Sequence, residues 1–271
     1  MRPGPSADDR YAESMVTLAR IPAGSVTLRD ARRGTERTVK LVSYEFATTT
    51  VTATEFMAGR RLTEQEGRLP ATGVRWMDAV TWCNSASEAE RLQPAYLELA
   101  SGVRWDPTAN GFRLPTEAEW VHASMGGTPG PRHGPLDEIA WSASDRVTGP
   151  RPAALKAANA FGVFDTLGNV WEWCWDRLDP ARYGDYRLLK GGGWADPAWS
   201  CRVGVRRGNA PDAVVEDVGL RIARGAVAPG GDGDASGLGT GGGQGWSEAA
   251  DRRRASLPHP LPLGWTPLHV E

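Results

Sequence analysis

Glycine and tryptophan constrain this chain more than any other feature of its sequence. The 271 residues include 33 glycines and 12 tryptophans, and long apolar runs are scarce. Glycine adopts turn conformations that other residues avoid, and each tryptophan ring removes a large apolar area from water. We therefore expect a fold built largely from turns and irregular loops, in which tryptophans supply the burial that regular elements do not.

The clearest helical pattern covers residues 76–91. Met77, Val80 and Cys83 follow one another at spacings of three residues, so they share one face of a helix. Asp78 falls in the first turn, where a carboxylate stabilises the helix dipole. The pattern predicts a helix that packs this face against a core.

A second helix is expected at residues 115–123. Thr116 stands at the N-cap position, and Glu119 three residues later completes a capping box. Glu117 and Glu119 also invite an acid–base role, but we interpret them as cap and surface residues. The remaining regular elements are short, with strands expected at 16–21 and 39–46 and a helix beginning near Thr52.

Two helices in an irregular chain with short strands indicate an α+β domain. No alternating series of strands and helices is present, so a doubly wound sheet is excluded.

Charge, hydropathy and cysteine usage exclude several classes of protein. The net charge of −2 gives no reason to expect a nucleic-acid partner, and no apolar run approaches the length of a membrane helix. The N-terminus has no hydrophobic signal region. Three cysteines, Cys83, Cys174 and Cys201, are too few for a disulfide framework, and they favour a reducing, cytoplasmic location.

Composition divides the chain into three parts. Residues 1–14 are polar and expected to be disordered. Residues 15–224 form the expected folded domain. Residues 225–271 are expected to be a flexible Gly/Pro-rich tail, because ten of the 21 residues from 225 to 245 are glycine. The final Pro-rich stretch could instead be an extended segment that docks on the domain.

Seven short segments occur in a fixed order between Arg20 and Arg221. They are RIPAG (20–24), VRWMDA (74–79), QPAY (93–96), ANGFRLPTEAEW (109–120), GNVWEWC (168–174), KGGGW (190–194) and VGLR (218–221). In this combination the chain resembles the formylglycine-generating enzyme, or sulfatase-modifying factor, family. The resemblance implies a C-type-lectin-like, duplicated fold with little regular secondary structure, in agreement with the α+β interpretation.

The resemblance also locates a catalytic centre, with departures from the family pattern. In the enzymes, two cysteines after a Gly-Gly-Ser turn bind one Cu(I) ion and activate O₂, which oxidises a substrate cysteine to formylglycine. Here the second cysteine position is Cys201, the first is Asp196, and the turn serine is replaced by Gly193. Because Cu(I) prefers thiolates to carboxylates, these departures argue against the standard copper oxidase chemistry.

A structural calcium loop of the family matches residues 165–172. The resemblance implies carboxylate ligands from Asp165 and Glu172 and carbonyl ligands from Gly168 and Val170, a mixed oxygen shell of the kind that calcium accepts. The alternative is a hydrogen-bonded loop without an ion.

Two functions remain open at this point. One is a divergent, oxygen-dependent oxidoreductase that acts on a peptide or small molecule with Cys201, Asp196 and Trp171, and needs copper or iron. The four histidines show no ligand spacing. The other is a non-catalytic module that binds a peptide or small molecule, with Cys201 a buried core residue. The family's ligand-binding face maps to Trp194, Trp199, Arg202, Arg206 and Asn209.

Overall fold

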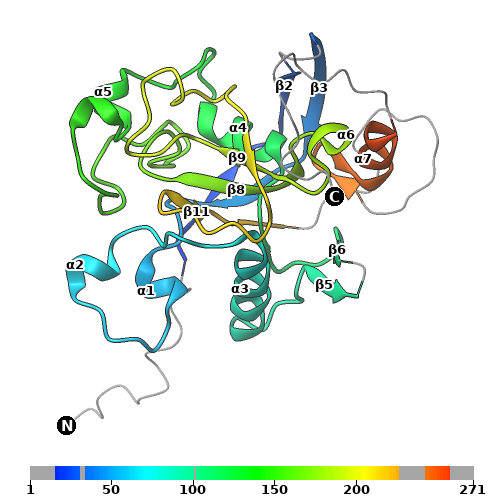
Figure 1. Cartoon of the computed structure of the whole chain (residues 1–271), viewed down its shortest axis with the longest axis horizontal. Helices are drawn as coiled ribbons and strands as arrows, with labels where there is room; N and C mark the ends of the chain where they lie inside the picture. The colour runs from blue at the N-terminus through cyan, green and yellow to red at the C-terminus, as the bar shows by residue number, and fades with distance from the viewer. Residues whose placement is uncertain (1–15, 31–33, 101, 226–241, 257–271) are drawn as a thin grey trace, which may run out of the picture.

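Two four-stranded sheets form the centre of the molecule (Figure 1). The computed structural model describes residues 16–30, 34–100, 102–225 and 242–256. The first sheet has the order β1 (Leu18–Ile21), β4 (Tyr44–Ala47), β12 (Ala223–Arg224), β7 (Phe112–Arg113), and the second β10 (Arg207–Asn209), β9 (Arg187–Lys190), β8 (Trp171–Arg177), β11 (Val218–Leu220). Three hairpins flank them: β2 (Gly24–Asp30) with β3 (Thr35–Leu41), β5 (Tyr96–Leu99) with β6 (Gly102–Trp105), and β13 (Gly242–Gly243) with β14 (Trp246–Ser247).

Helices surround these sheets, and most of them are a single turn. They are α1 (Ala53–Phe56), α2 (Glu64–Gly67), α3 (Trp76–Ala89), α4 (Glu117–Met125), α5 (Leu136–Ile139), α6 (Pro180–Tyr183) and α7 (Glu248–Ala255), with a 3₁₀ turn at Ala143–Asp145. None of the helices in the described part of the chain is long and apolar enough to cross a bilayer. The mixed architecture confirms the predicted α+β class.

Strand β8 divides the interior into two hydrophobic cores. Side chains alternate across a strand, so Trp171, Trp173 and Trp175 enter the core that also holds α3. Cys174 enters the second core, which contains Trp120 of α4. The tryptophan-rich sequence of this strand thus supplies three of the six buried tryptophans of one core in the described part of the chain, and tryptophan provides burial as the composition predicted.

Both predicted helices are present as α3 and α4, and α4 has the expected capping box. Helix α4 begins after Thr116, whose Oγ1 accepts the backbone N–H of Glu119 at 3.2 Å, while Glu119 Oε2 accepts the Thr116 N–H at 3.0 Å. The expected surface position of the two glutamates was wrong, because Glu117 is 4% exposed and Glu119 is fully buried. Glu119 forms two hydrogen bonds with the buried Arg113, at 2.6 and 2.7 Å.

The strand expected at residues 39–46 is two strands in different sheets. Residues 42–43 interrupt it, so that β3 pairs with β2 and β4 pairs with β1 and β12. The side chain of Gln244 bonds both the N–H and the carbonyl of Val42, at 3.1 and 3.2 Å. A contact from 202 residues away satisfies the backbone at this break, which no local pattern could indicate.

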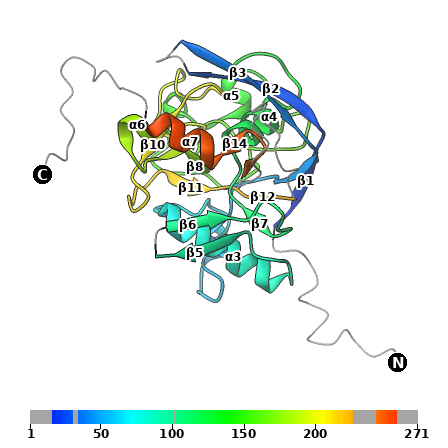
Figure 2. The same ribbon diagram turned by 90° about the vertical axis from the view of Figure 1, so that its right-hand side faces the viewer.

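Residues 242–256 pack on the domain, although they fall in the segment 225–271 for which a flexible tail was expected. Trp246 is 6% exposed and joins the core around Trp175. Figure 2 shows α7 across the face formed by β8 and β10, above the β5–β6 hairpin. Trp246 buries a large apolar side chain, although the glycine-rich composition around it had indicated a flexible segment. Residues 1–15, 226–241 and 257–271 lie outside the described residues, with the predictions made for them.

Candidate functional site

A glycine turn after β9 shapes the centre that the sequence predicted. Lys190 ends the strand, and Gly191 and Gly192 follow with φ of 102° and 89°. A Cβ atom on Gly192 would lie 2.9 Å from Cys201 Sγ. Only glycine therefore lets the chain turn back over the thiol of Cys201.

Asp196 is held by two donors at the end of this turn. Its Oδ2 accepts the indole N–H of Trp171 at 2.7 Å and the backbone N–H of Gly193 at 2.8 Å. The structure thus brings Trp171 and Asp196 into direct contact, with Asp196 bracing the turn.

Cys201 completes this group as a buried thiol. Its side chain is fully buried, and burial together with the nearby negative charge of Asp196 raises its pKa to about 11. In the absence of a metal ion the thiol is therefore protonated at neutral pH, whereas a cysteine nucleophile reacts as the thiolate. Cys83 and Cys174 are also buried, as expected for core residues.

The residues present do not fit a Cu(I) centre of the two-thiolate kind. A single thiol lies here, and the carboxylate in the other position already accepts two hydrogen bonds. Across the described ranges, no three His, Cys, Asp or Glu side chains gather as a metal-binding group.

The predicted calcium loop is held by hydrogen bonds within the protein. Asp165 Oδ2 accepts the Ala154 N–H at 2.7 Å, and the Asn169 side chain bonds both the N–H and the carbonyl of Arg151. Asp165 Oδ1 is buried and has no partner among the described residues. Burial raises the pKa of this carboxyl group.

Both carboxylate oxygens of Glu172, the second predicted carboxylate ligand, already accept hydrogen bonds from other side chains. Its oxygens accept the Nε and Nη2 of Arg221 at 2.7–3.1 Å and the indole N–H of Trp120 at 2.6 Å. Both charged side chains are fully buried. An ion would have to displace Arg221, so the four predicted ligands do not fit calcium in this arrangement.

Removal of calcium is expected to leave the stability unchanged. An ion that binds only the folded protein would raise the melting temperature, by an amount that grows with the logarithm of the free ion concentration above its Kd. We expect the melting temperatures in excess EGTA and in millimolar calcium to agree within about 1 °C, measured by differential scanning calorimetry. A fall of several degrees in EGTA would instead support the calcium ligand set.

Three of the five predicted ligand-binding residues line one groove of about 510 Å³. Trp199 is 63% exposed and Arg202 is also exposed, while Val203 and Leu178 contribute apolar surface. Arg202 Nε donates to the backbone carbonyl of Trp199 at 2.6 Å, which holds the guanidinium close to the main chain of Trp199. Its two Nη groups have no partner among the described residues.

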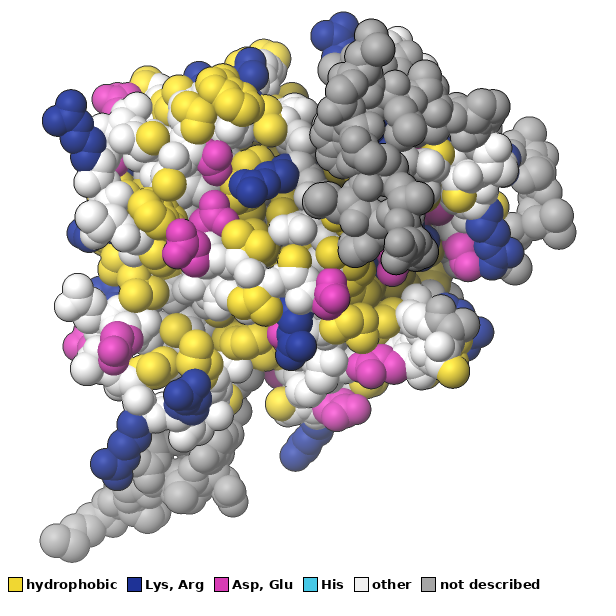
Figure 3. All heavy atoms as spheres, viewed as in Figure 1, with side chains coloured by type: hydrophobic (Ala, Val, Ile, Leu, Met, Phe, Trp, Pro, Cys, Tyr) yellow, Lys and Arg dark blue, Asp and Glu magenta, His cyan; other side chains and the backbone are white. Residues whose placement is uncertain are grey.

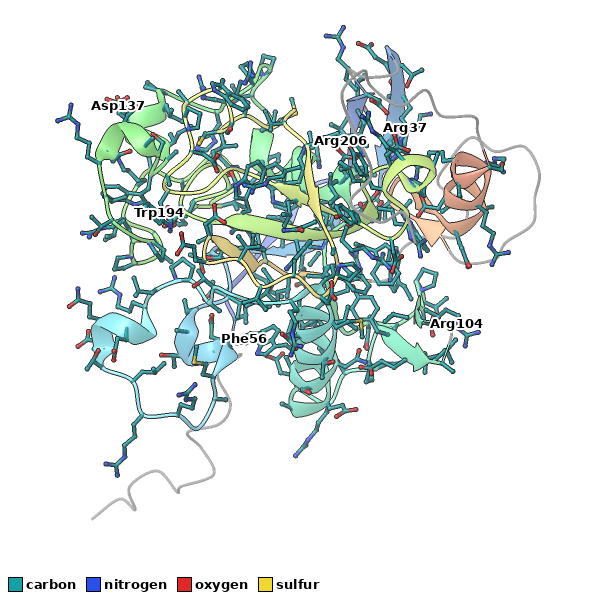
Figure 4. The ribbon with its side chains drawn as sticks, in the orientation of Figure 1. Arg37, Phe56, Arg104, Asp137, Trp194 and Arg206 are labelled. Carbon is teal, nitrogen blue, oxygen red and sulfur yellow. The ribbon has the colours of Figure 1, made fainter. Side chains whose placement is uncertain are left out.

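The other two predicted residues lie elsewhere. Figure 4 shows Trp194 on the left of the molecule, well apart from Arg206, which lies near the β2–β3 hairpin. Asn209 belongs to β10, where its Oδ1 accepts the N–H of Ala210 at 2.9 Å. Trp194 and Asn209 do not line the groove.

Comparison with known protein families identifies one that covers most of the chain. Residues 5–226 match the model of the sulfatase-modifying factor enzyme 1-like domain. The chain belongs to this family. The match covers the glycine turn and the groove, and it stops before Trp246.

Relatives in the sulfatase-modifying factor family carry different names. The chain is 32% identical over 196 residues to the inactive C-alpha-formylglycine-generating enzyme 2 of Mus musculus, covering 62% of this chain and 63% of that one. It is 30% identical over 195 residues to the chaperone protein LppX of Paenibacillus barcinonensis, covering 57% and 69%. It is 33% identical over 149 residues to the formylglycine-generating enzyme of Streptomyces coelicolor, covering 43% and 48%.

Solved structures support the fold of this family member. The Treponema denticola variable protein 1 matches with a TM-score of 0.70 and 28% identity, over 77% of this chain and 95% of that one. PvdO from Pseudomonas aeruginosa matches with a TM-score of 0.62 and 23% identity, over 76% and 93%, which shows the fold alone. The predicted family and the C-type-lectin-like fold are confirmed.

A buried charge cluster behind the groove was missed by the sequence analysis of this family member. Glu117 Oε1 lies 2.8 Å from Arg206 Nε and 3.6 Å from Lys190 Nζ, and its backbone N–H donates to Asp176. Burial alone would raise the Glu117 pKa, but Arg206 and Lys190 hold it below the usual value. Arg206 is therefore committed to this cluster, and Arg202 is left as the free cation of the groove in the described part of the chain.

Proposed function

We propose that this chain is a ligand-binding member of the sulfatase-modifying factor family that recognises a peptide or small molecule bearing an acidic group. The exposed pair of Trp199 and Arg202 in the 510 Å³ groove carries the proposal. Exposed aromatic and arginine side chains are recognition anchors, and a guanidinium with free Nη groups binds carboxylates in a bidentate manner.

The chemistry of the glycine turn supports binding over copper-dependent oxidation. A single thiol at Cys201 and a carboxylate at Asp196 that braces the turn do not supply two thiolates. The mouse relative, which is described as inactive, shows that the family includes members without the enzyme activity.

A divergent oxidoreductase is the second candidate. One observation favours it: Trp171, Asp196 and Cys201 gather at the same turn. This candidate requires a redox metal, and it predicts that the purified chain retains one copper or iron ion and consumes O₂ with a thiol substrate.

Peptide selection tests the binding proposal. A heptapeptide library displayed on phage would be selected on the immobilised wild-type protein, and the affinities of the enriched peptides measured by fluorescence anisotropy. We expect acidic peptides whose affinity falls at least tenfold in both Trp199→Ala and Arg202→Glu. Val214→Ala is the matched control, because Val214 is exposed to 68% and does not line the groove.

Two results would contradict the proposal. One is a set of peptides whose binding does not depend on Trp199 and Arg202. The other is stoichiometric copper or iron, found by elemental analysis after loading, together with metal-dependent O₂ consumption, which would establish the oxidoreductase instead.

A further inference from the structure

A second and larger pocket, of about 980 Å³, lies on another face of the molecule. The β5–β6 hairpin, the start of α3, strands β8 and β9, and the C-terminal segment with α7 all contribute to its wall. Figure 1 shows α7 above and the β5–β6 hairpin below this region, and Figure 2 shows the same elements from the side. Trp246, Glu248 and Arg252 come from beyond residue 226, where the family match ends.

Three indole rings form the inner wall of this pocket. Trp105, Trp175 and Trp246 lie with ring centroids 5.4–5.9 Å apart, in tilted and edge-to-face contacts. Leu97 and Leu99 of β5 stand at the rim, 47% and 49% exposed. The exposed apolar surface of the pocket therefore comes from the two rim leucines, while the indoles present only a small part of their surface.

The inner wall also carries hydrogen-bond donors that the protein does not use. Trp105 and Trp175 are 3% and 2% exposed, and neither indole N–H has a partner among the described residues. Arg187, 5% exposed, likewise has an unpartnered Nε. By contrast, the indole of Trp76 donates to the Cys174 carbonyl at 3.1 Å. A buried donor without a partner is costly.

The carboxylates of the pocket, unlike these donors, already have partners. Asp106 accepts the N–H and hydroxyl of Thr108, and Glu98 accepts the Thr81 hydroxyl at 3.2 Å. Asp185 pairs with Arg177 at 2.9 Å, and Glu248 pairs with Arg252. The buried groups of this pocket that lack a hydrogen-bond partner are therefore donors, and a complementary ligand carries acceptor atoms.

Two arginines add positive charge to this pocket, each with one carboxylate of the lining nearby: Asp185 near Arg187 and Asp106 near Arg104. Arg187 stacks on Trp76 with its guanidinium carbon 3.8 Å from the ring centroid, and its nearest carboxylate contact is Asp185 at 3.8 Å. Burial lowers the pKa of Arg187 to about 10, so it stays charged at neutral pH. Arg104 projects from β6 at the rim (Figure 4).

We propose that this pocket binds a small organic anion, a carboxylate or sulfonate on an aromatic or branched apolar body. The acidic group pairs with the exposed Arg104, and it reaches the unpartnered donors of Trp105, Trp175 and Arg187 after a small opening of the wall, because these atoms are buried. The apolar body packs on Leu97 and Leu99 at the rim. Figure 4 shows Arg104 and Arg206 in separate parts of the molecule, so this site is distinct from the groove of Trp199 and Arg202.

The dye 8-anilinonaphthalene-1-sulfonate is the probe for this site, because it is an aromatic sulfonate that fluoresces on binding. We expect about one dye per folded chain. Phenylacetate should displace it, whereas 2-phenylethylamine, which has the same ring and a cation in place of the carboxylate, should not.

Variants assign the dye to the pocket. Leu97→Glu places a negative charge at the exposed rim and should weaken dye binding at least tenfold. Leu155→Glu is the matched control, since Leu155 is 51% exposed and does not line the pocket. Trp105→Phe keeps an aromatic ring but removes one free N–H, and it should weaken binding several-fold.

Three results would overturn the proposal. The first is unchanged dye affinity in the Leu97→Glu variant, whose exposed position leaves the fold intact. The second is equal displacement by phenylacetate and 2-phenylethylamine. The third is loss of dye binding in Trp199→Ala, which would place the dye in the other groove.

Discussion

Replacing Arg221 by methionine is expected to reduce the free energy of unfolding by about 3–5 kcal/mol, because it leaves the buried carboxylate of Glu172 without a counter-charge. Arg221 also donates to the carbonyls of Ala47 and Phe164, at 2.9 and 2.8 Å. One guanidinium thus connects β4, the loop before β8, and β8 itself. Urea unfolding followed by tryptophan fluorescence measures the change.

The control for this prediction is Arg224→Met. Arg224 pairs with Glu45 at 3.5 Å, but both side chains are partly exposed. Such a pair contributes at most about 1 kcal/mol. The double variant Glu172→Gln/Arg221→Met removes the buried charge and should recover part of the loss. Equal effects of Arg221→Met and Arg224→Met would contradict the assigned role of the buried pair.

The second large effect is expected from Gly168→Ala. Gly168 has φ of 70°, and a Cβ atom there would lie 2.1 Å from the carbonyl oxygen of Trp141. The contact is to backbone, which cannot rotate away. Strain and overpacking each cost about 1–3 kcal/mol, so we expect the variant to lose about 3 kcal/mol or more, or to fail to fold.

Gly162→Ala separates the two causes. Gly162 has a similar φ of 76°, but no atom lies within 4 Å of the added Cβ. The backbone strain alone should cost about 1 kcal/mol. Thermal unfolding of the two variants side by side measures the difference. If Gly162→Ala were as destabilising as Gly168→Ala, the contact with Trp141 would not be the cause.

Local signals in the sequence were sufficient for several elements. The capping box at Thr116 depends on residues three apart, and the apolar spacing at Val80 and Cys83 depends on one helix face, so both predictions survive in the structure. The family resemblance indicated Trp199, Arg202 and Arg206 as ligand-binding candidates, and these residues, which lie within one short segment, line one groove.

The pairing of buried charged side chains could not be predicted in the same way. On the face shown in Figure 3, acidic and basic side chains are interspersed, which agrees with the net charge of −2. The buried pairs do not follow from composition: Glu172 and Arg221 are 49 residues apart, and Glu117 and Arg206 are 89 apart. A sequence does not show which carboxylate will face which guanidinium, so Glu172 resembled a calcium ligand.

The sequence by itself determined the family, the α+β class and the two longest helices of the predicted domain, because each follows from short-range spacing or from motifs in a fixed order. The tertiary structure alone decided which partners meet. It placed Arg221 on Glu172, Trp171 on Asp196, and Trp246 on Trp175. The physical reason is that buried polar and aromatic groups are stabilised by contacts across the fold, and such contacts have no signature along the chain.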